Sequence, residues 1–392
     1  MEEWKEYKLE DIGNVVGGAT PSTKDATNYD GDITWITPKD LSNHNDRYIY
    51  RGERMITQKG FESCSCKMLP KGSVLFSSRA PIGYVAIAGT DMCTNQGFKS
   101  VVPNNEIVDT HFLYYLLLFN KAKIEGMGSG TTFKEVSGNV MKSVTVSIPN
   151  LTEQKRIASI LSSLDDKIEL NRRKNDNLEK QAQALFNHYF IENIESLGAF
   201  EEVSLLDIAT YTNGLAMQKY RPSEDETSFL PVLKIKELGQ GFTDSNSDIC
   251  TYNIPNIYII NSGDIIFSWS GTLMVRIWCG EMVGLNQHLF KVSSDSYEKW
   301  FYYFWTKYHL RKFINIANDK AVTMGHIRRE DLAKSKVILP NQTTLQNLNK
   351  IFSPILDSII NNEIESKRLS QLRDTLLPRL MSGELKINDL NC

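Results

Sequence analysis

The chain has 392 residues, of which 41% are hydrophobic and 23% charged, and its formal net charge is −3. These values are typical of a globular protein with two or more cores, and they exclude a disordered or fibrous chain. The near-neutral charge does not by itself indicate a nucleic-acid-binding protein.

The N-terminal segment MEEWKEYKLEDIG contains neither a basic region nor an apolar core, so no secretory signal is predicted. The longest apolar stretches, FLYYLLLF from Phe112 and WFYYFW from Trp300, are much shorter than a membrane-spanning helix. We therefore expect a cytoplasmic location. Of the six cysteines, only Cys64 and Cys66 are close in sequence, and this spacing favours neither a disulfide framework nor a zinc site.

Residues 1–149 are predicted to form a first module of mixed α and β structure. The segment GSVLFSSRAPIGYVAIAG from Gly72 combines β-forming residues with turn residues, which is typical of strands. DTHFLYYLLLFNKAKIEG from Asp109 predicts short core helices, because its aromatic row is too apolar to face solvent. KSVTVSIP from Lys142 predicts a final strand that leads into a long helix.

Residues 150–194 are predicted to form this long helix. Its apolar and asparagine residues recur at alternating steps of four and three, which is a heptad pattern. Asn150, with Glu153 three residues later, is a candidate helix cap. The predicted seam comprises Ile157, Leu161, Leu164, Ile168, Asn171, Leu178 and Leu185.

A second module (195–340) and a distal helix (341–386) repeat this arrangement. GDIIFSWSGTLMVRIWCG from Gly263 aligns with the segment from Gly72, and Pro340 lies 191 positions after Pro149. The same offset relates distant positions without a gap, which predicts two homologous halves. The second seam comprises Leu348, Phe352, Ile355, Ile359, Asn362, Leu369 and Leu376.

The two seams can be buried in two ways. They can pair as an antiparallel coiled coil about a pseudo-twofold axis, which would bring Asn171 and Asn362 together, since a buried asparagine fixes register at a cost in stability. A helix from 152 to 189 would then span roughly 55 Å at about 1.5 Å per residue. Alternatively, each helix packs on its own module. We favour the coil, and the predicted fold class is α+β, with two modules separated by two long helices.

Signatures of a catalytic site are missing from the sequence. No Gly-Lys pair occurs, which excludes a Walker-type phosphate loop. Pro354, Asp357, Glu365 and Lys367 imitate a nuclease motif, but Glu365 and Lys367 are two residues apart on a predicted helix and would point to different faces. The six histidines include no pair at i, i+4 spacing. We therefore expect no catalytic residue, metal or cofactor in the chain itself.

The succession of module, IPNLTEQKRIASILSSLDDKIELNRR, module and LRDTLLPRLMSGEL resembles the specificity subunits of type I restriction-modification enzymes over essentially the whole chain. The start of the second helix departs from the pattern, with Thr344 and Leu345 where Glu153 and Gln154 stand in the first. The resemblance implies two target recognition domains that read a split, asymmetric site on double-stranded DNA. It further implies a helix pair that sets the spacing and docks two methyltransferase subunits. Restriction subunits would join this core, and S-adenosylmethionine and ATP would belong to the partners.

Candidate DNA-binding residues follow from the chemistry of base edges, which are read by side chains such as Arg, Lys, Asn and Gln on exposed loops. The candidates next to duplicated positions are Lys39, Arg79, Lys99, Thr131 and Lys134 in the first module, and Lys234, Lys236, Trp269, Arg276, His326 and Arg328 in the second. Asn95–Gln96 and Asn286–Gln287 are equivalent in the two modules, which predicts a shared structural role.

Two other functions stay open. The chain could be a non-catalytic scaffold that binds protein or glycan ligands, in which case its DNA affinity would not be salt-sensitive. It could also be an enzyme with an unfamiliar site, for instance in GSGTTFKEVSG from Gly128, in which case the pure chain would be active.

Overall fold

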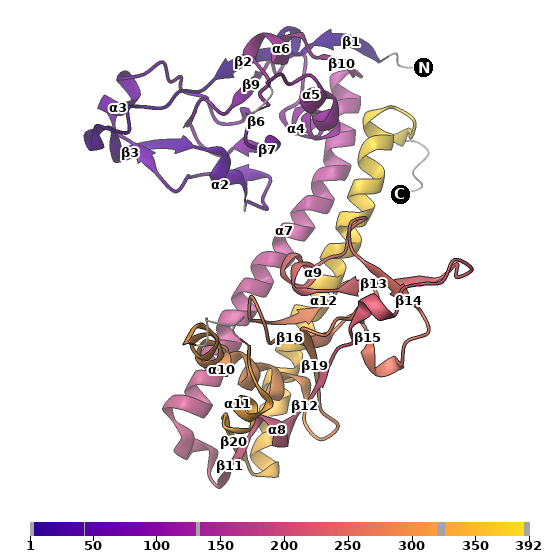
Figure 1. Ribbon diagram of the computed structural model, residues 1–392. Helices are drawn as coiled ribbons and strands as arrows, with labels where there is room; N and C mark the ends of the chain where they lie inside the picture. Colours follow the sequence, from indigo (N-terminus) through magenta and orange to yellow (C-terminus); the bar gives the residue numbers. More distant parts are fainter. Residues whose placement is uncertain (1–3, 43, 131–133, 320–325, 388–392) are drawn as a thin grey trace. The chain divides into compact units, whose positions relative to one another are not determined.

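The computed structural model describes residues 4–42, 44–130, 134–319 and 326–387, and it contains two compact units (Figure 1). Unit 1 comprises residues 1–169 and 369–392, and unit 2 comprises residues 170–368. Each unit therefore contains one module and parts of both long helices. The reason is that α7 (Leu151–Asn187) and α12 (Gln342–Met381) each run from one unit into the other.

The first module is built on a five-stranded sheet in the order β2-β9-β6-β7-β4, in which β4 is parallel to β7 and the other neighbours are antiparallel. A smaller sheet has the order β5-β3-β8, and β1 pairs with β10 just before α7. The strands are β1 (Lys5–Lys8), β2 (Gly13–Gly17), β3 (Tyr29–Ile36), β4 (Tyr48–Ile49), β5 (Met55–Ile56), β6 (Val74–Ser78), β7 (Ile82–Ala88), β8 (Cys93–Thr94), β9 (Lys99–Pro103) and β10 (Thr145–Ile148).

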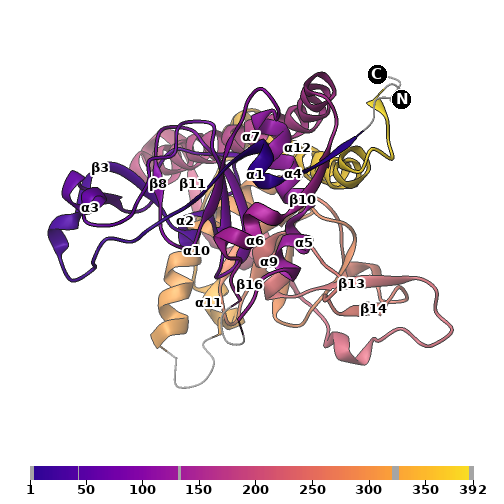
Figure 2. The same cartoon turned by 90° about the horizontal axis from the view of Figure 1, so that it is seen from above.

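Helices of the first module lie at both of its ends and between them (Figure 1). Figures 1 and 2 show α3 and β3 at one end and α4 at the other. The helices are α1 (Leu9–Ile12), α2 (Pro38–Ser42), α3 (Gln58–Glu62), α4 (Thr110–Phe119), α5 (Lys121–Gly126) and α6 (Gly138–Ser143).

The second module repeats the order of four strands of the main sheet, with β12-β19-β16-β17 in place of β2-β9-β6-β7, and differs at the edges of both sheets. Its two four-stranded sheets have the orders β12-β19-β16-β17 and β14-β13-β18-β15, and β11 pairs with β20 just before α12. The strands are β11 (Phe200–Ser204), β12 (Thr210–Asn213), β13 (Phe229–Leu233), β14 (Ile249–Thr251), β15 (Ile259–Ile260), β16 (Asp264–Ser268), β17 (Met274–Trp278), β18 (Val283–Leu285), β19 (Leu289–Ser293) and β20 (Lys336–Pro340). The helices are α8 (Leu205–Ile208), α9 (Ile235–Gln240), α10 (Lys299–Asp319) and α11 (Arg329–Ala333).

The two long helices begin with the same cap. The Asn150 Oδ1 atom accepts a hydrogen bond from the Glu153 backbone at 2.9 Å, and Asn341 Oδ1 accepts one from Thr344 at 2.9 Å. In unit 1 the buried Gln154 side chain also donates to the Ile107 and Pro149 carbonyls and accepts from the Asp109 backbone. Gln154 therefore ties the start of α7 to the start of α4.

Both units bury the end of one long helix beside the beginning of the other. In unit 1, Ile157 and Leu161 of α7 share a core with Leu376 and Leu380 of α12. In unit 2, Ala182 and Phe186 of α7 share a core with Leu348, Phe352 and Leu356 of α12. Low residue numbers on α7 meet high numbers on α12 and vice versa, so the helices run antiparallel within each unit.

Aromatic residues of α10 complete the core of unit 2. The rings of Trp300 and Phe352 stack with centroids 4.3 Å apart and planes 13° apart, and Phe186 meets Trp305 edge-on. The indole Nε1 of Trp300 donates to Asn349 Oδ1 at 2.8 Å. Because these rings come from α7, α10 and α12, both long helices are integral to the unit.

Polar residues of the helix pair meet between the apolar ends. The Asn171 amide donates to the Asn362 carbonyl at 3.4 Å and to the Glu365 carboxylate at 2.7 Å. The Asn362 amide donates to Asn175 Oδ1 at 2.9 Å. Within unit 2 the structure thus brings together the two asparagines that occupy equivalent positions in the repeat.

The seam residues divide between deep and partial burial. Ile157, Leu161, Asn171, Leu348, Phe352 and Ile359 are buried, whereas Leu164, Ile168, Leu178, Leu185, Ile355, Asn362, Leu369 and Leu376 are partly buried. The most deeply buried apolar positions pack into the module cores, so both ways of burying the seams contribute. The predicted α+β class, with two mixed modules and two antiparallel long helices, is confirmed.

Candidate nucleic-acid interface

Each module has a small cluster of residues, here called a corner, where two neighbouring strands of its main sheet end and begin. The backbone follows the same path in both corners. We define the first corner as Ser78, Arg79, Asn95–Gly97, Lys99 and Glu135. The second corner, displaced by 191 positions, is Trp269, Ser270, Asn286–His288, Phe290 and His326. These residues lie at or just after the ends of β6 and β16, in the turns before β9 and β19 and the first residues of those strands, and in the segments after α5 and α10.

Four backbone hydrogen bonds recur around the two corners. In the first module they join Ala19 N to Thr94 O, Ser78 N to Gly97 O, Asn95 N to Ile36 O, and Val136 N to Ser78 O, over 2.7 to 3.0 Å. In the second they join Leu215 N to Leu285 O, Trp269 N to His288 O, Asn286 N to Leu233 O, and Ile327 N to Trp269 O, over 2.9 to 3.4 Å. The two corners therefore have one backbone framework.

Glycine is required at the same place beside each corner. A Cβ on Gly18 would lie 2.1 Å from the Asn95 carbonyl oxygen, and one on Gly214 would lie 2.2 Å from that of Asn286. Asn95 Oδ1 also accepts a hydrogen bond from the Gly97 backbone at 2.9 Å, so its side chain shapes the turn. This contact agrees with the structural role that the equivalence of Asn95 and Asn286 predicts.

The side chains of the first corner are charged. Glu135 lies between two cations, with Oε2 3.4 Å from Arg79 Nη1 and Oε1 3.4 Å from Lys99 Nζ. Lys99 also donates to Ser78 Oγ and to the Gln96 carbonyl, and its side chain is only 14% exposed. Arg79 is 35% exposed, so a guanidinium group stands at the surface on a fixed support.

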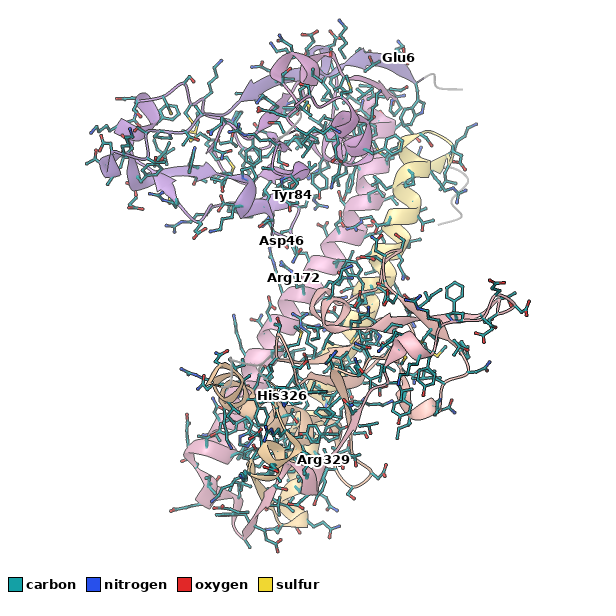
Figure 3. All side chains as sticks on the ribbon, in the orientation of Figure 1. Glu6, Asp46, Tyr84, Arg172, His326 and Arg329 are labelled. Carbon is teal, nitrogen blue, oxygen red and sulfur yellow. The ribbon has the colours of Figure 1, made fainter. Side chains whose placement is uncertain are left out.

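The side chains of the second corner are uncharged or aromatic. The Trp269 ring lies 5.8 Å from that of His288 and 6.3 Å from that of His326 (Figure 3 labels His326). The Trp269 indole donates to Asn213 Oδ1 at 2.9 Å. Ser270 Oγ and His288 Nδ1 are 3.2 Å apart. The second corner therefore presents aromatic rings and a few polar atoms where the first corner has Arg79 and Lys99.

Two more predicted residues, Lys39 and Lys236, lie on short helices next to the corners. Lys39 belongs to α2 and forms a 2.7 Å ion pair with Glu53, which raises the pKa of the lysine. Lys236 belongs to α9 and lies 3.4 Å from Asp244. Both lysines are exposed, so they can exchange these carboxylates for phosphate groups.

The remaining predicted residues have separate surroundings. Lys234 pairs with Asp248 and lowers the pKa of that carboxyl group. Arg276 is exposed on β17, and the Arg328 backbone is bound by Asp331 at the start of α11. Lys134 is exposed, and Thr131 lies outside the described residues.

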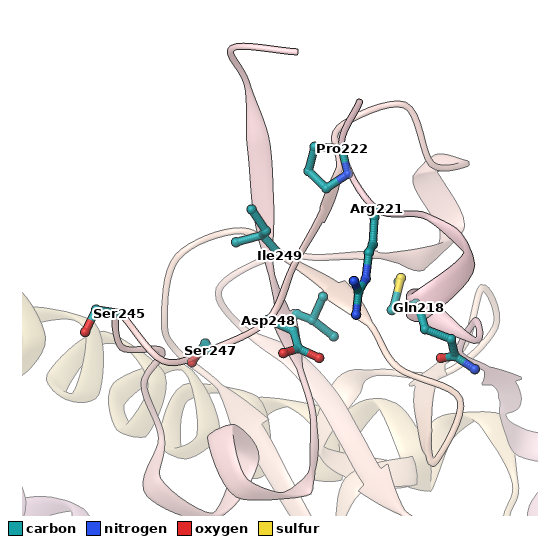
Figure 4. A pocket seen from close by; sticks show the side chains of 9 residues that line it. Gln218, Arg221, Pro222, Ser245, Ser247, Asp248 and Ile249 are labelled. Carbon is teal, nitrogen blue, oxygen red and sulfur yellow. The ribbon is translucent and has the colours of Figure 1, made fainter. Parts of the chain in front are cut away.

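A pocket of about 500 Å³ lies beside Lys234 in the second module. Figure 4 shows the side chains of Arg221 and Asp248 directed into the same space. The pocket is lined by Met217, Gln218, Arg221, Pro222, Val232, Ser245, Ser247, Asp248 and Ile249. Its polar groups could hold a phosphate or a base edge. The sequence offered no sign of Arg221, because the offset of 191 relates this residue to Asp30 in β3, which has a different kind of side chain.

Comparison with known proteins identifies the family. The profile of the type I restriction modification DNA specificity domain matches residues 1–180 and 198–374. The chain belongs to the family of type I restriction-modification specificity subunits. It is 34% identical to the MjaIX specificity subunit of Methanocaldococcus jannaschii, over 99% of this chain and 95% of that protein. It is 23% identical to the HindI specificity subunit of Haemophilus influenzae, over 98% and 100% of the respective chains.

A solved structure shows the same fold. The crystal structure of a type I restriction-modification S subunit from M. genitalium matches with a TM-score of 0.59 and 18% identity, and the match covers 96% of each chain. In this specificity subunit, the described residues include no group of three or more His, Cys, Asp or Glu side chains that could hold a metal ion. Among the same residues, no helix is both long and apolar enough to cross a membrane.

Several residues in or next to the two corners of this specificity subunit were not predicted. Glu135, Asn213 and His288 are each in contact with a predicted residue. The offset of 191 relates Glu135 to His326, which was a predicted residue, so Glu135 could have been predicted in the same way. Asn213 and Gly214 relate to Gly17 and Gly18 by 196 positions instead, so a comparison without gaps cannot align them.

Proposed function

We propose that this chain is the DNA-reading subunit of a type I restriction-modification complex and recognises a bipartite, asymmetric site on double-stranded DNA. The observation that carries the proposal is the pair of corners, which share a backbone framework and differ in side-chain chemistry. A fixed scaffold with exchangeable side chains is what two readers of different base sequences require.

We further propose that α7 and α12 set the spacing of the two half-sites. The first module precedes α7 in the chain and the second follows it. α7 contains 37 residues, so at about 1.5 Å per residue it is longer than one DNA turn of about 34 Å. Unread base pairs are therefore expected between the half-sites. In each unit, one end of α7 and one end of α12 are built into the core of the module, which supports a role of the helices in carrying the two modules.

The partners proposed for this subunit are two methyltransferase subunits, joined by restriction subunits. The net charge of −3 supports this assembly, because DNA affinity depends largely on cations that contact phosphates and partners would have to supply many of them. In this proposal, S-adenosylmethionine and ATP bind to the partners and catalysis occurs there. The chain would act in the cytoplasm, on the DNA that it reads.

The test is reconstitution of the chain with its methyltransferase subunits. The complex should methylate a split site and bind it with an affinity that falls steeply with salt, whereas the pure chain should not methylate DNA. Methyl transfer by the pure chain would favour an enzyme with its own site. An absence of salt-sensitive DNA binding by the complex would favour the scaffold for protein or glycan ligands.

A further inference from the structure

We propose that the first corner recognises a guanine through Arg79 and that Glu135 and Lys99 are positioning residues for its guanidinium group. This inference rests on the proposed function and assigns one base of one half-site. The second corner has Ser270 and Phe290 in place of Arg79 and Lys99, so this guanine contact belongs to the first corner.

The surroundings of Arg79 distinguish it from an ordinary surface arginine. It follows the last residue of β6, whose backbone donates to Gly97 and accepts from Val136. This bonding fixes the point from which the side chain leaves the sheet. Among the described residues, the polar contact of its side chain is the 3.4 Å ion pair from Nη1 to Glu135. The rest of the guanidinium fork can therefore donate two parallel hydrogen bonds, which matches the O6 and N7 acceptors of guanine.

Lys99 has a different role because its ammonium group is already engaged. It has three acceptors, Ser78 Oγ, the Gln96 carbonyl and Glu135 Oε1, at 3.4 to 3.5 Å. With 14% of its side chain exposed, it is poorly placed to reach a base. It instead holds the Glu135 carboxylate, and Glu135 in turn holds one side of the Arg79 fork.

The second corner replaces each charged group of the first at the same offset. Ser270 stands in place of Arg79, Phe290 in place of Lys99 and His326 in place of Glu135. The backbone bonds persist through this exchange, so the difference lies in the side chains. A serine cannot make the bidentate contact of an arginine, which confines this particular guanine contact to the first corner.

The test is base-resolved mapping of methylation by the complete complex of this chain with its methyltransferase subunits. Arg79→Ala should relax one G·C position in the first half-site by about 5- to 150-fold, the range for loss of a bidentate base contact. Arg79→Lys should relax the same position and retain more activity, because it keeps the charge and loses the fork. The matched control, Trp269→Ala, should alter the other half-site only.

Three results would overturn the inference, and each differs from failure of the proposed function. The first is an unchanged specificity in both Arg79 variants, and the second is relaxation at a position that is not G·C. The third is uniform loss of methylation in Arg79→Ala with selectivity retained in Arg79→Lys, which would make Arg79 structural. Failure of the wild-type complex to methylate any split site would instead remove the proposed function, and the inference with it.

Discussion

Arg373 of α12 donates to Asp165 of α7 with a distance of 2.7 Å, whereas the equivalent positions in unit 2 are Ala182 and Leu356. Asp165 also accepts a hydrogen bond from the Tyr115 hydroxyl, and 14% of its side chain is exposed. Ala182 and Leu356 lie in one apolar core. The same place in the packing of α7 against α12 therefore holds an ion pair in unit 1 and an apolar pair in unit 2.

Removing Arg373 should destabilise unit 1. Arg373→Ala leaves Asp165 mostly buried without its cation, and the expected loss in the free energy of unfolding is about 3 kcal/mol. Urea unfolding monitored by circular dichroism measures this loss. The control is Asp374→Asn, because Asp374 also pairs with Arg373 but is 64% exposed; it should cost less than about 1 kcal/mol.

The apolar pair at the equivalent positions of unit 2 suggests a compensating double variant in unit 1. Asp165→Leu combined with Arg373→Ala copies Leu356 and Ala182, and it should recover most of the stability lost in Arg373→Ala because no unpaired charge remains. Recovery should be incomplete, since Tyr115 loses its acceptor. A double variant as unstable as the sum of the single variants would show that this layer does not tolerate an apolar pair.

A chain that ends near Glu195 should form a homodimer through α7. An antiparallel partner would place Ala182 of one copy where Arg373 stands in the full chain, so each Asp165 would lack its cation. Ala182→Arg should therefore tighten the dimer more than about tenfold, measured by analytical ultracentrifugation. With methyltransferase subunits, the fragment should direct methylation of a symmetric site.

The full-length chain provides the control for this substitution. There Ala182 is fully buried in the core of unit 2, so Ala182→Arg should destabilise the protein. A monomeric fragment, or a dimer that the arginine weakens, would contradict the predicted exchange of helix partners.

Stability should fall on mild acidification because of two histidines, of which His309 is buried and His111 is half-buried. Burial lowers the pKa of His309, which lies 2.8 Å from the Lys336 carbonyl, and burial also lowers the pKa of His111 in unit 1. The unfolded chain binds protons on these residues below the ordinary value near 6.5, whereas the folded chain resists protonation. The unfolded state therefore gains stability as pH falls through this value, by up to about 1.4 kcal/mol per pH unit for His309. The gain is smaller for His111, because 37% of its side chain is exposed and solvent screens the effect.

Urea unfolding at pH 7.5 and pH 5.5 measures this effect. His309→Gln retains a side-chain donor and should reduce the pH dependence of unit 2, and His111→Gln should do the same for unit 1. His188 is exposed, and His188→Gln serves as the control for the substitution itself. An equal pH dependence in all the variants would assign the effect to other groups.

The sequence predicted the long-range organisation well because its signals are redundant. The seams, the helix caps and the final strands all recur at one offset, and β10, α7, β20 and α12 lie where these patterns indicate. The first helix ends earlier than the expected residue 194. A π-helical turn, His188–Glu192, and a 3-10 turn, Ile194–Leu197, follow Asn187, and they place Phe190 and Leu197 in the core of unit 2. Heptad periodicity does not report such local changes of winding.

The corners were predicted less completely because they depend on contacts between distant segments. Arg79, Lys99, Trp269 and His326 were predicted by their proximity to repeated positions, yet no local pattern shows that Glu135 lies between Arg79 and Lys99. The pairing of Trp269 with Asn213 joins segments 56 positions apart. Sheet topology decides which side chains meet at such a site. The periodicity of the sequence does not determine that topology.

Neutralising Glu135 should increase the attraction of the complex for DNA in general while reducing its selectivity. Glu135→Gln removes the carboxylate that lies 3.4 Å from both Arg79 and Lys99, so one more cation can contact phosphate. The slope of log affinity against log salt concentration should steepen by about 1, measured by fluorescence anisotropy with the complete complex on a non-cognate duplex. Glu202→Gln is the matched control, since it makes the same charge change beside Lys336, on the pair of strands β11 and β20. An equal increase of this slope in both variants would mean that only the net charge matters. An increase confined to Glu135→Gln would indicate that the first corner lies close to the DNA backbone.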